Sequence, residues 1–296
     1  MNGSPRVTAL MVNRNHGRFI GEAITSVAAQ SCEDWELVIV DNGSTDHSWE
    51  MIRGWSEKEA RIRAIRLERA VEIPAARNMG LAHARGEYVA TIDSDDVWVA
   101  SRLSRQLEVM EAKDEVGVCG ANVWVIDQSG RECGLKTFPA SHAACLEALW
   151  YRNPFCHSAT LVRRSCFARC GRYDESFGPV EDLELWFRIG IEFRFENLSE
   201  PLARYRVWRG NATSRQYRRM VRQTLRVRRL AAGRYGYRMG WRGQLALAAT
   251  WCAQFVPPRL ARGLFERCVL GRTAPAPGLS WAKQARTGVE MGLRCW

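Results

Sequence analysis

Three aspartates lie within four positions of one another, at Asp93, Asp95 and Asp96. They directly follow the apolar run from Tyr88 to Ile92, whose β-branched and aromatic residues are typical of a buried strand in a parallel sheet. Ligands of open α/β sheets bind beyond the carboxyl ends of the strands. Carboxylates this close repel one another unless a cation lies between them. Oxygen ligands suit Mg²⁺ or Mn²⁺, with water and phosphates completing the shell. We therefore expect a cation site here.

The same residues also fit a simpler interpretation. Ser94 or one of the aspartates could cap a helix that begins near Val97, because a helix N-terminus favours both hydroxyl and carboxylate side chains. The spacing alone leaves both interpretations open.

A second predicted strand also ends in an acid. The apolar run from Trp35 to Val40 leads to Asp41. If the two strands are neighbours, Asp41 and the aspartate run converge at one edge of the sheet. Asp41 suits a ribose hydroxyl or a base N–H, and the aspartates with a cation suit a pyrophosphate. The chain contains neither Gly-x-Gly-x-x-Gly nor Gly-x-x-x-x-Gly-Lys-Ser/Thr, so metal and basic side chains must meet the phosphate charge.

Strand-like and helix-like runs alternate through the first part of the chain. Strands are predicted at residues 6–12, 35–40, 61–67 and 88–92, and helices at 19–30, 48–59 and 74–84. Pro74 suits the first turn of the last of these helices. The alternation predicts βαβ units and a mostly parallel sheet.

The following stretch is less regular. It predicts a helix at 100–113, a strand at 116–126, a turn at 127–130, a helix from a Ser141 cap to Trp150, and a helix beginning near Pro179. Glu181 and Asp182 fall in the first turn of that last helix. Acids in this position also stabilise the helix dipole without doing any chemistry.

Five stretches occur in a recognisable order. They are Val12-Asn13, the Ser26-Val27…Gln30-Ser31 run, the run from Glu36 to Asp46, Ala76-Arg77-Asn78-x-Gly80, and the run from Gly86 to Asp96. Together they closely resemble the nucleotide-sugar glycosyltransferases of family 2, over about residues 6–210. The resemblance implies the GT-A fold, an α/β structure with a mostly parallel central sheet flanked by helices. It also implies inversion of the anomeric centre.

The resemblance further implies roles for individual residues. Asp41 would bind the nucleobase or ribose, Asp93 the ribose or the metal, and Asp95 the Mn²⁺ or Mg²⁺ that bridges the two phosphates. The donor-binding set is completed by Asn13, Arg77 and Arg206. Arg77 would lie near the pyrophosphate, and a solvated helix face is its alternative.

Displacement of a nucleoside diphosphate with inversion requires one base opposite the leaving group, which takes the proton of the acceptor hydroxyl. The family's Glu-Asp pair occurs here as Glu181-Asp182, followed by Leu-Trp-x-Arg. On this resemblance we assign the base to Asp182, with Glu181 as the second choice. No covalent enzyme intermediate is required.

The acceptor side carries fewer signals. His157 matches a position that often faces the acceptor, and a buried histidine with a structural role fits equally well. Family members commonly read Tyr-Arg-x-His where this chain reads Tyr205-Arg206-Val-Trp208. Tryptophan cannot ligate Mn²⁺, so the third protein ligand stays open. Trp208 is predicted, with His157, to bind the acceptor.

Charge is distributed unevenly along the 296 residues, which carry a net charge of +11. Residues 1–213 hold 26 Lys+Arg against 30 Asp+Glu, and residues 214–296 hold 17 against 2. We predict a GT-A catalytic domain at 1–213 and a basic amphipathic helical extension at 214–296. Basic helices with apolar and aromatic faces suit an anionic membrane surface. The alternative is that they pack on the catalytic domain. No nucleic-acid signature occurs, so no nucleic-acid partner is expected.

The start of the chain shows no signal-peptide pattern, and the longest mostly apolar run, Leu245 to Val256, is too short to span a bilayer. The ten cysteines are scattered without a Cys-x-x-Cys pair, which favours reduced thiols. We expect a cytoplasmic protein, peripheral at the inner face of the membrane.

The sequence thus predicts an inverting glycosyltransferase that uses a nucleoside-diphosphate sugar, with UDP favoured. The acceptor would be a glycan or lipid-linked sugar in cell-surface polysaccharide synthesis. Two other classes stay open: a catalytically inactive nucleotide-sugar-binding protein of the same fold, and a basic nucleic-acid-binding protein. The missing glycine fingerprint disfavours a Rossmann-type dehydrogenase.

Overall fold

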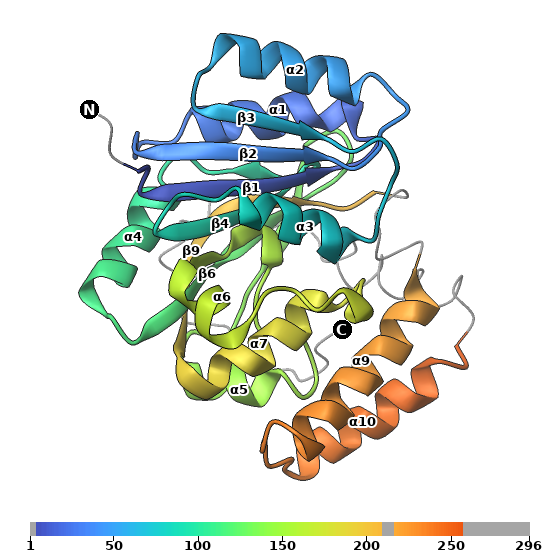
Figure 1. The fold of residues 1–296 in the computed structure, drawn as a ribbon. Coiled ribbons are helices and arrows are strands. Elements are labelled where there is room, and N and C mark those ends of the chain that lie inside the picture. The colour runs from blue at the N-terminus through green and yellow to red at the C-terminus, as the bar shows by residue number, and fades with distance from the viewer. Residues whose placement is uncertain (1–3, 209–215, 257–296) are drawn as a thin grey trace.

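The computed structural model describes residues 4–208 and 216–256. In these ranges one central sheet carries helices on both faces (Figure 1). The strands are β1 (Val7–Asn13), β2 (Trp35–Asp41), β3 (Ile62–Arg66), β4 (Tyr88–Asp93), β5 (Val97–Trp98), β6 (Val116–Ile126), β7 (Glu132–Lys136), β8 (Leu161–Arg163) and β9 (Arg194–Arg206).

The α-helices are α1 (Gly17–Ala28), α2 (Ser48–Lys58), α3 (Ile73–Ala82), α4 (Arg102–Ala112), α5 (His142–Ala148), α6 (Arg164–Cys170), α7 (Glu181–Glu192), α9 (Tyr217–Gly233) and α10 (Trp241–Ala253). Two short 3-10 helices are η1 (His157–Ala159) and η2 (Glu175–Phe177).

The described strands are ordered β3-β2-β1-β4-β8-β6-β9-β5, with β7 paired to β6. The pairs β3–β2, β2–β1 and β1–β4 are parallel. β8 then runs antiparallel to both β4 and β6, while β6 and β9 pair in parallel. The sheet is therefore mixed, and its parallel half brings the carboxyl ends of β1, β2 and β4 to one edge.

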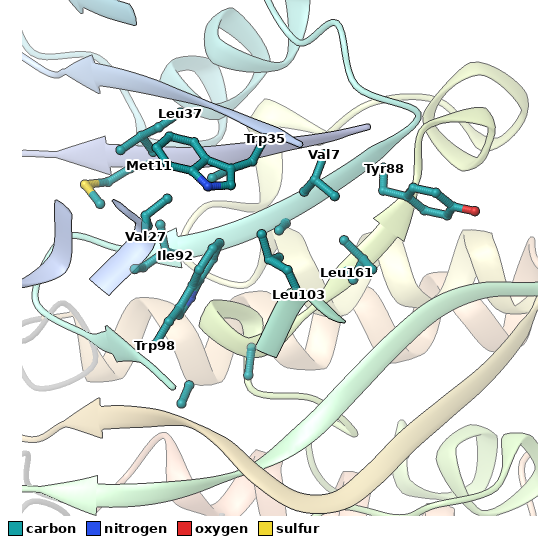
Figure 2. Close-up of a cluster of buried hydrophobic side chains, with 14 of the residues drawn as sticks. Val7, Met11, Val27, Trp35, Leu37, Tyr88, Ile92, Trp98, Leu103 and Leu161 are labelled. Carbon is teal, nitrogen blue, oxygen red and sulfur yellow. The ribbon is translucent and has the colours of Figure 1, made fainter. Parts of the chain in front are cut away.

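The strands β1, β2 and β4 are apolar on both faces, as strands between two helix layers must be. On one face Val7 and Met11 pack with α1, α2 and α4. Figure 2 shows Met11, Leu37 and Ile92, from the three neighbouring strands, within this cluster. On the other face Leu10 packs with α3 and with the helices that follow β6. Residues alternate between the two clusters along each strand, which fixes the strand register.

The predicted strands and helices up to β4 are confirmed to within two residues. The predicted Ser141 cap of α5 is also confirmed, because its side chain accepts a hydrogen bond from the Ala144 N–H. One interpretation is wrong: no helix begins near Val97. Val97 and Trp98 form β5, which pairs with β9. That partner lies far away in the sequence, so the local pattern could not indicate it.

The helix α9 packs on the same side of the sheet as α7. Val227 and Ala231 are fully buried in a cluster that also holds Phe187 and Ile189. Figure 1 shows α10 lying beside α9 at this end of the molecule. None of the described helices is long and apolar enough to cross a membrane. The part of the predicted helical extension that follows residue 256 lies outside the described residues.

Candidate active site

The carboxyl ends of β1, β2 and β4 meet at one edge of the sheet. The parallel register pairs Asn13 of β1 with Asp41 of β2, and Val12 of β1 with Asp93 of β4. The backbone thus brings the predicted donor-binding residues Asn13, Asp41 and Asp93 together.

Asp41 is fully buried and holds the loop that follows β2. Its Oδ1 accepts hydrogen bonds from Asn13 Nδ2 at 2.9 Å and from the Ser44 hydroxyl at 2.5 Å. Gly43, within this loop, has a φ of +65°, and a Cβ there would lie 2.7 Å from the Ala70 nitrogen. Glycine is therefore required at this turn. The predicted contact of Asp41 with a base or ribose stays a prediction.

Arg77 of α3 bridges two acids from different elements. Its guanidinium donates to Asp93 Oδ1 at 3.0 Å and pairs at its other nitrogen with Glu181 Oε1. Its side chain is only 12% exposed, so it does not lie on a solvated helix face. Burial lowers the pKa of Arg77, but Glu181 and Asp93 outweigh burial and the pKa is raised. A permanent positive charge thus links the end of β4 to the start of α7.

The two acids that open α7 have different surroundings. Glu181 is 3% exposed, and burial raises its pKa to about 7 although Arg77 opposes this. Asp182 is less buried; its Oδ2 accepts a hydrogen bond from Asn153 Nδ2 at 2.6 Å. Burial also raises the pKa of Asp182, with Arg77 again acting against it. One acid is therefore held in an ion pair and the other by an uncharged amide.

Asp95 lies beside an aromatic cluster. Its Oδ2 accepts a hydrogen bond from the Trp208 indole N–H at 2.7 Å. The Trp208 ring packs edge-on against His16 and Phe19, with ring centroids 5.6 and 5.3 Å apart. These contacts place Trp208 at the start of α1. The predicted contact of Trp208 with the acceptor stays a prediction.

Arg206, predicted to bind the donor, is buried, with 2% of its side chain exposed. Its guanidinium donates to the Asp95 carbonyl at 2.7 Å and to the Glu22 carboxylate at 2.6 Å. Its backbone N–H donates to Asp96 Oδ1 at 2.7 Å. Contact with a phosphate would require these bonds to break. Arg206 thus holds the aspartate run in place, and its predicted contact with the donor stays a prediction.

Arg18 carries no motif signal, yet it lies next to the predicted metal ligand. Its guanidinium carbon is 4.1 Å from the centre of the Trp208 ring and 4.3 Å from that of Phe19. The residue is exposed, and within the described ranges it forms no ion pair. A guanidinium stacked on aromatic rings keeps its N–H groups free for a ligand. Only the fold could reveal this cation, because its ring partner Trp208 is distant in the sequence.

His157 is the first residue of η1 and is 9% exposed. Its Nε2 is 2.9 Å from the Tyr173 hydroxyl. Burial, with Arg77 and Arg102 adding to it, lowers the pKa of His157 well below the usual value. The ring is therefore neutral in the folded protein. Its predicted contact with the acceptor stays a prediction.

Several buried polar atoms around this edge have no hydrogen-bond partner among the residues that the structure describes. They are Asn13 Oδ1, Asp96 Oδ2, His157 Nδ1 and Glu181 Oε2. Buried polar groups are normally paired, and unpaired ones require an explanation such as a ligand or water. Their gathering here indicates a site that a polar ligand completes.

The aspartate run offers a cation few protein ligands. Asp93 pairs with Arg77, one oxygen of Asp95 is engaged by Trp208, and Asp96 is 1% exposed. Across the described residues no three His, Cys, Asp or Glu side chains group as metal ligands. Mg²⁺ is commonly held by one or two carboxylates plus substrate phosphates. Asp93 and Asp95 fit that mode, and do not fit a metal site made by the protein alone.

A mixed α/β sheet flanked by helices, with acids at the carboxyl ends of its parallel strands, defines a protein of the GT-A class. TarS of S. aureus, solved in complex with UDP-GlcNAc, matches with a TM-score of 0.63 at 17% identity, over 84% of this chain and 72% of that one. The mannosyltransferase PcManGT from Pyrobaculum calidifontis, solved with GDP-Man and Mn²⁺, matches with a TM-score of 0.58 at 18% identity, over 90% of this chain and 81% of that one.

The sequence model of Glycosyl transferase family 2 matches residues 8–169. A relative in Escherichia coli, the UDP-Glc:alpha-D-GlcNAc-diphosphoundecaprenol beta-1,3-glucosyltransferase WfaP, is 30% identical over 208 residues, which are 68% of this chain and 77% of WfaP. The chain belongs to glycosyltransferase family 2. The predicted family, the GT-A fold and the glycosyltransferase activity are confirmed.

Proposed function

We propose that the protein transfers a sugar, with inversion, from a nucleoside-diphosphate sugar to a glycan or lipid-linked acceptor in cell-surface polysaccharide synthesis. The Arg77 bridge carries this proposal. It ties Asp93, at the end of β4, to Glu181, which is followed directly by Asp182. Donor-side and acceptor-side acids are thus held on one arginine. WfaP, whose name specifies a diphosphoundecaprenol-linked acceptor, supports the acceptor class.

Asp182 is the proposed general base. Its carboxylate takes the proton of the acceptor hydroxyl while the acceptor oxygen bonds to the anomeric carbon. On the opposite face the bond from that carbon to the donor phosphate oxygen breaks, and the nucleoside diphosphate leaves with the electron pair. Asn153 orients the carboxylate through Oδ2. Burial raises the pKa of Asp182, which makes this carboxylate a stronger base than a solvated aspartate.

Glu181 is assigned a positioning role, although it is the second candidate for the base. It is 3% exposed and paired with Arg77, so its carboxylate is less open to an acceptor than that of Asp182. Its charge instead fixes the Arg77 guanidinium between α3 and α7.

The donor would lie along the edge formed by β1, β2 and β4. Asn13 and Asp41 would meet the nucleoside, and Arg77 and Arg18 the diphosphate. Asp95 and Asp93 would hold Mg²⁺ or Mn²⁺, which when bound neutralises charge on the diphosphate. PcManGT was solved with GDP-Man and Mn²⁺. We favour a UDP-sugar for this chain because WfaP is named for UDP-Glc and TarS was solved with UDP-GlcNAc.

The test is turnover by the Asp182→Asn variant. We expect kcat for UDP release in the presence of a lipid-linked acceptor to fall at least about 100-fold, the usual share of a general base. Thermal stabilisation by UDP with Mn²⁺ should be retained, because the donor edge is untouched. Glu192→Gln, at the other end of α7 and paired with Arg169, is the matched control and should leave kcat unchanged.

Unchanged turnover by Asp182→Asn would remove Asp182 as the base. Absence of any nucleotide-dependent stabilisation, over UDP, GDP and dTDP, would contradict the donor class. The anomeric configuration of the product, read by NMR, tests inversion separately.

A further inference from the structure

The surface of α9 is basic, and the segment that contains it has no acidic residue of its own. Residues 216–256 contain nine arginines and neither Asp nor Glu. Four of these arginines recur at helical spacing and are exposed on one face of α9: Arg218, Arg222, Arg226 and Arg229. In the described part of the chain, Arg218, Arg222 and Arg229 form no ion pair, whereas Arg219 pairs with Glu72 at 2.9 Å. The charge of this stripe is thus left for a partner.

The neighbouring helix α10 exposes an apolar stripe. Trp241 and Leu245 of this helix are 67% and 61% exposed, and Phe255, two residues beyond its end, is 67% exposed. With the exposed Ala248 and Cys252 they follow the spacing of a single helix face. The opposite face, with Ala246 and Thr250, is buried against the rest of the molecule. A helix that buries its small residues and exposes its large apolar ones requires a second partner.

A hollow of about 290 Å³ joins the arginines to the second helix. Its lining consists of Arg222, Leu225, Arg226, Arg229, Trp251 and Gln254. Three guanidinium groups around one hollow suit a phosphate, which accepts several charge-assisted hydrogen bonds at once. Trp251, 49% exposed, offers an amphipathic ring at the rim.

We propose that this α9–α10 surface docks on an anionic lipid bilayer. The arginines and the hollow would take lipid phosphates, and Trp241, Leu245 and Phe255 would enter the layer between headgroups and acyl chains. Single helices that lie in this layer combine a basic face with a face of Trp, Phe and Leu. Here the neighbouring helices α9 and α10 supply these two components. The surface is separate from the donor edge, so the proposal goes beyond the catalytic site and does not depend on the donor or acceptor.

Charge decides against other occupants. Residues 257–296 hold seven Lys+Arg against two Asp+Glu, so this segment of the chain would be repelled by the arginine stripe. A second copy of the same surface would be repelled for the same reason. A nucleic acid would match the arginines but would leave the apolar stripe of α10 without a partner. An anionic bilayer would bind both the arginine stripe of α9 and the apolar stripe of α10.

The test is flotation of the full chain with vesicles at about 0.15 M salt. We expect binding to phosphatidylcholine vesicles that contain a quarter phosphatidylglycerol, and none to phosphatidylcholine alone. Arg222→Gln/Arg229→Gln should weaken binding about 25-fold, from about fivefold for each arginine near an anionic surface. Trp241→Ser/Phe255→Ser should weaken it at least about tenfold. Arg53→Gln/Arg131→Gln, which removes two exposed charges elsewhere, is the matched control and should bind like the wild type.

Three results would overturn the proposal. One is equal vesicle binding by the wild type and both surface variants. Another is the absence of vesicle binding together with binding of a duplex oligonucleotide that Arg222→Gln/Arg229→Gln weakens and Trp241→Ser/Phe255→Ser leaves unchanged. The third is a concentration-dependent dimer that the Trp241→Ser/Phe255→Ser change abolishes, again without vesicle binding. Equal melting temperatures of all variants show that each is folded.

Discussion

At the scale of single residues, the indole N–H of Trp208 engages one oxygen of Asp95 over 2.7 Å. Removing the donor while keeping a ring should free that oxygen for a cation. We expect Trp208→Phe to bind Mn²⁺ in the presence of UDP about tenfold more tightly than the wild type, because a hydrogen bond to a charged group, worth about 1.5 kcal/mol, no longer competes with the cation. Isothermal titration with Mn²⁺ measures this.

The matched control is Phe19→Leu, which alters the same aromatic cluster without touching Asp95. It should leave the Mn²⁺ affinity unchanged. If Trp208→Phe also leaves it unchanged, Asp95 does not ligate the cation through that oxygen.

A second residue, His157, should make stability depend on pH. Burial lowers its pKa well below the value of an unfolded histidine, about 6.5. Above that pH both states are neutral; below it the unfolded chain binds a proton that the folded protein excludes. Stability therefore falls as pH falls through 6.5. Between pH 7.5 and 5.5 the wild type should lose about 1 kcal/mol more than His157→Gln in urea unfolding.

The comparison isolates His157, because Glu181, whose raised pKa of about 7 acts in the opposite direction, is present in both proteins. Parallel pH profiles for the two proteins would mean that the ring is accessible to protons in the fold.

The acids of the site could be predicted from the sequence, whereas most of the contacts that hold them could not. Asp41 and Asp93 directly follow apolar strands, and a parallel sheet brings such ends together. The resemblance brings Arg206 and Trp208 to the site, but it does not indicate their contacts with Asp95, and nothing in the sequence indicates the contact of Asn153 with Asp182. Their contacts with the acids depend on the long-range pairing of β6, β8 and β9. The stacked position of Arg18 is hidden for the same reason.

At the scale of elements, two glycines within helices have opposite surroundings, which the sequence does not distinguish. A Cβ at Gly80 of α3 would lie 2.3 Å from Leu10 Cδ1 and 3.0 Å from Val40 Cγ2. A Cβ at Gly54 of α2 would meet no atom within 4 Å. We expect Gly80→Ala to destabilise the protein by about 1–3 kcal/mol through overpacking. Gly54→Ala should stabilise it by up to about 1 kcal/mol, because alanine is the better helix former.

Urea unfolding of the two variants measures the predicted loss of stability for Gly80→Ala and the predicted gain for Gly54→Ala. The same substitution is made in both helices, so each variant controls for the other. A gain in stability at Gly80 would show that α3 can move away from the sheet without loss.

The elements up to β4 could be predicted because each follows a single local pattern. Buried strands read as apolar runs, and α1, α2 and α3 follow with one apolar face each. The same reasoning fails at β5, because this strand consists only of Val97 and Trp98, which pair with β9. So short a segment cannot show the side-chain alternation of a strand, and only its pairing with β9 identifies it as one.

At the scale of the whole molecule, the helix α9 both packs on the helix α7 and presents a charged surface. Val227 and Ala231 are fully buried with Phe187 and Ile189 of α7. The arginines on the opposite face of α9 are exposed. One helix thus has an inward face that belongs to the core and an outward face that carries the charge. The sequence shows the charge clearly, while the inward face depends on contacts with α7.

This arrangement predicts that α9 unfolds together with the catalytic domain. Val227→Asp places a charge in the shared core and should lower the melting temperature of the whole chain by about 6 °C or more, from a loss of about 3 kcal/mol. The UDP-bound chain should also melt lower by a similar amount, since the donor edge belongs to the same cooperative unit. Arg229→Asp, two residues away on the exposed face of the same helix, is the matched control and should melt like the wild type. A Val227→Asp chain with unchanged melting and UDP binding would instead support a separate extension beginning near residue 214, because α9 could then detach without loss to the sheet.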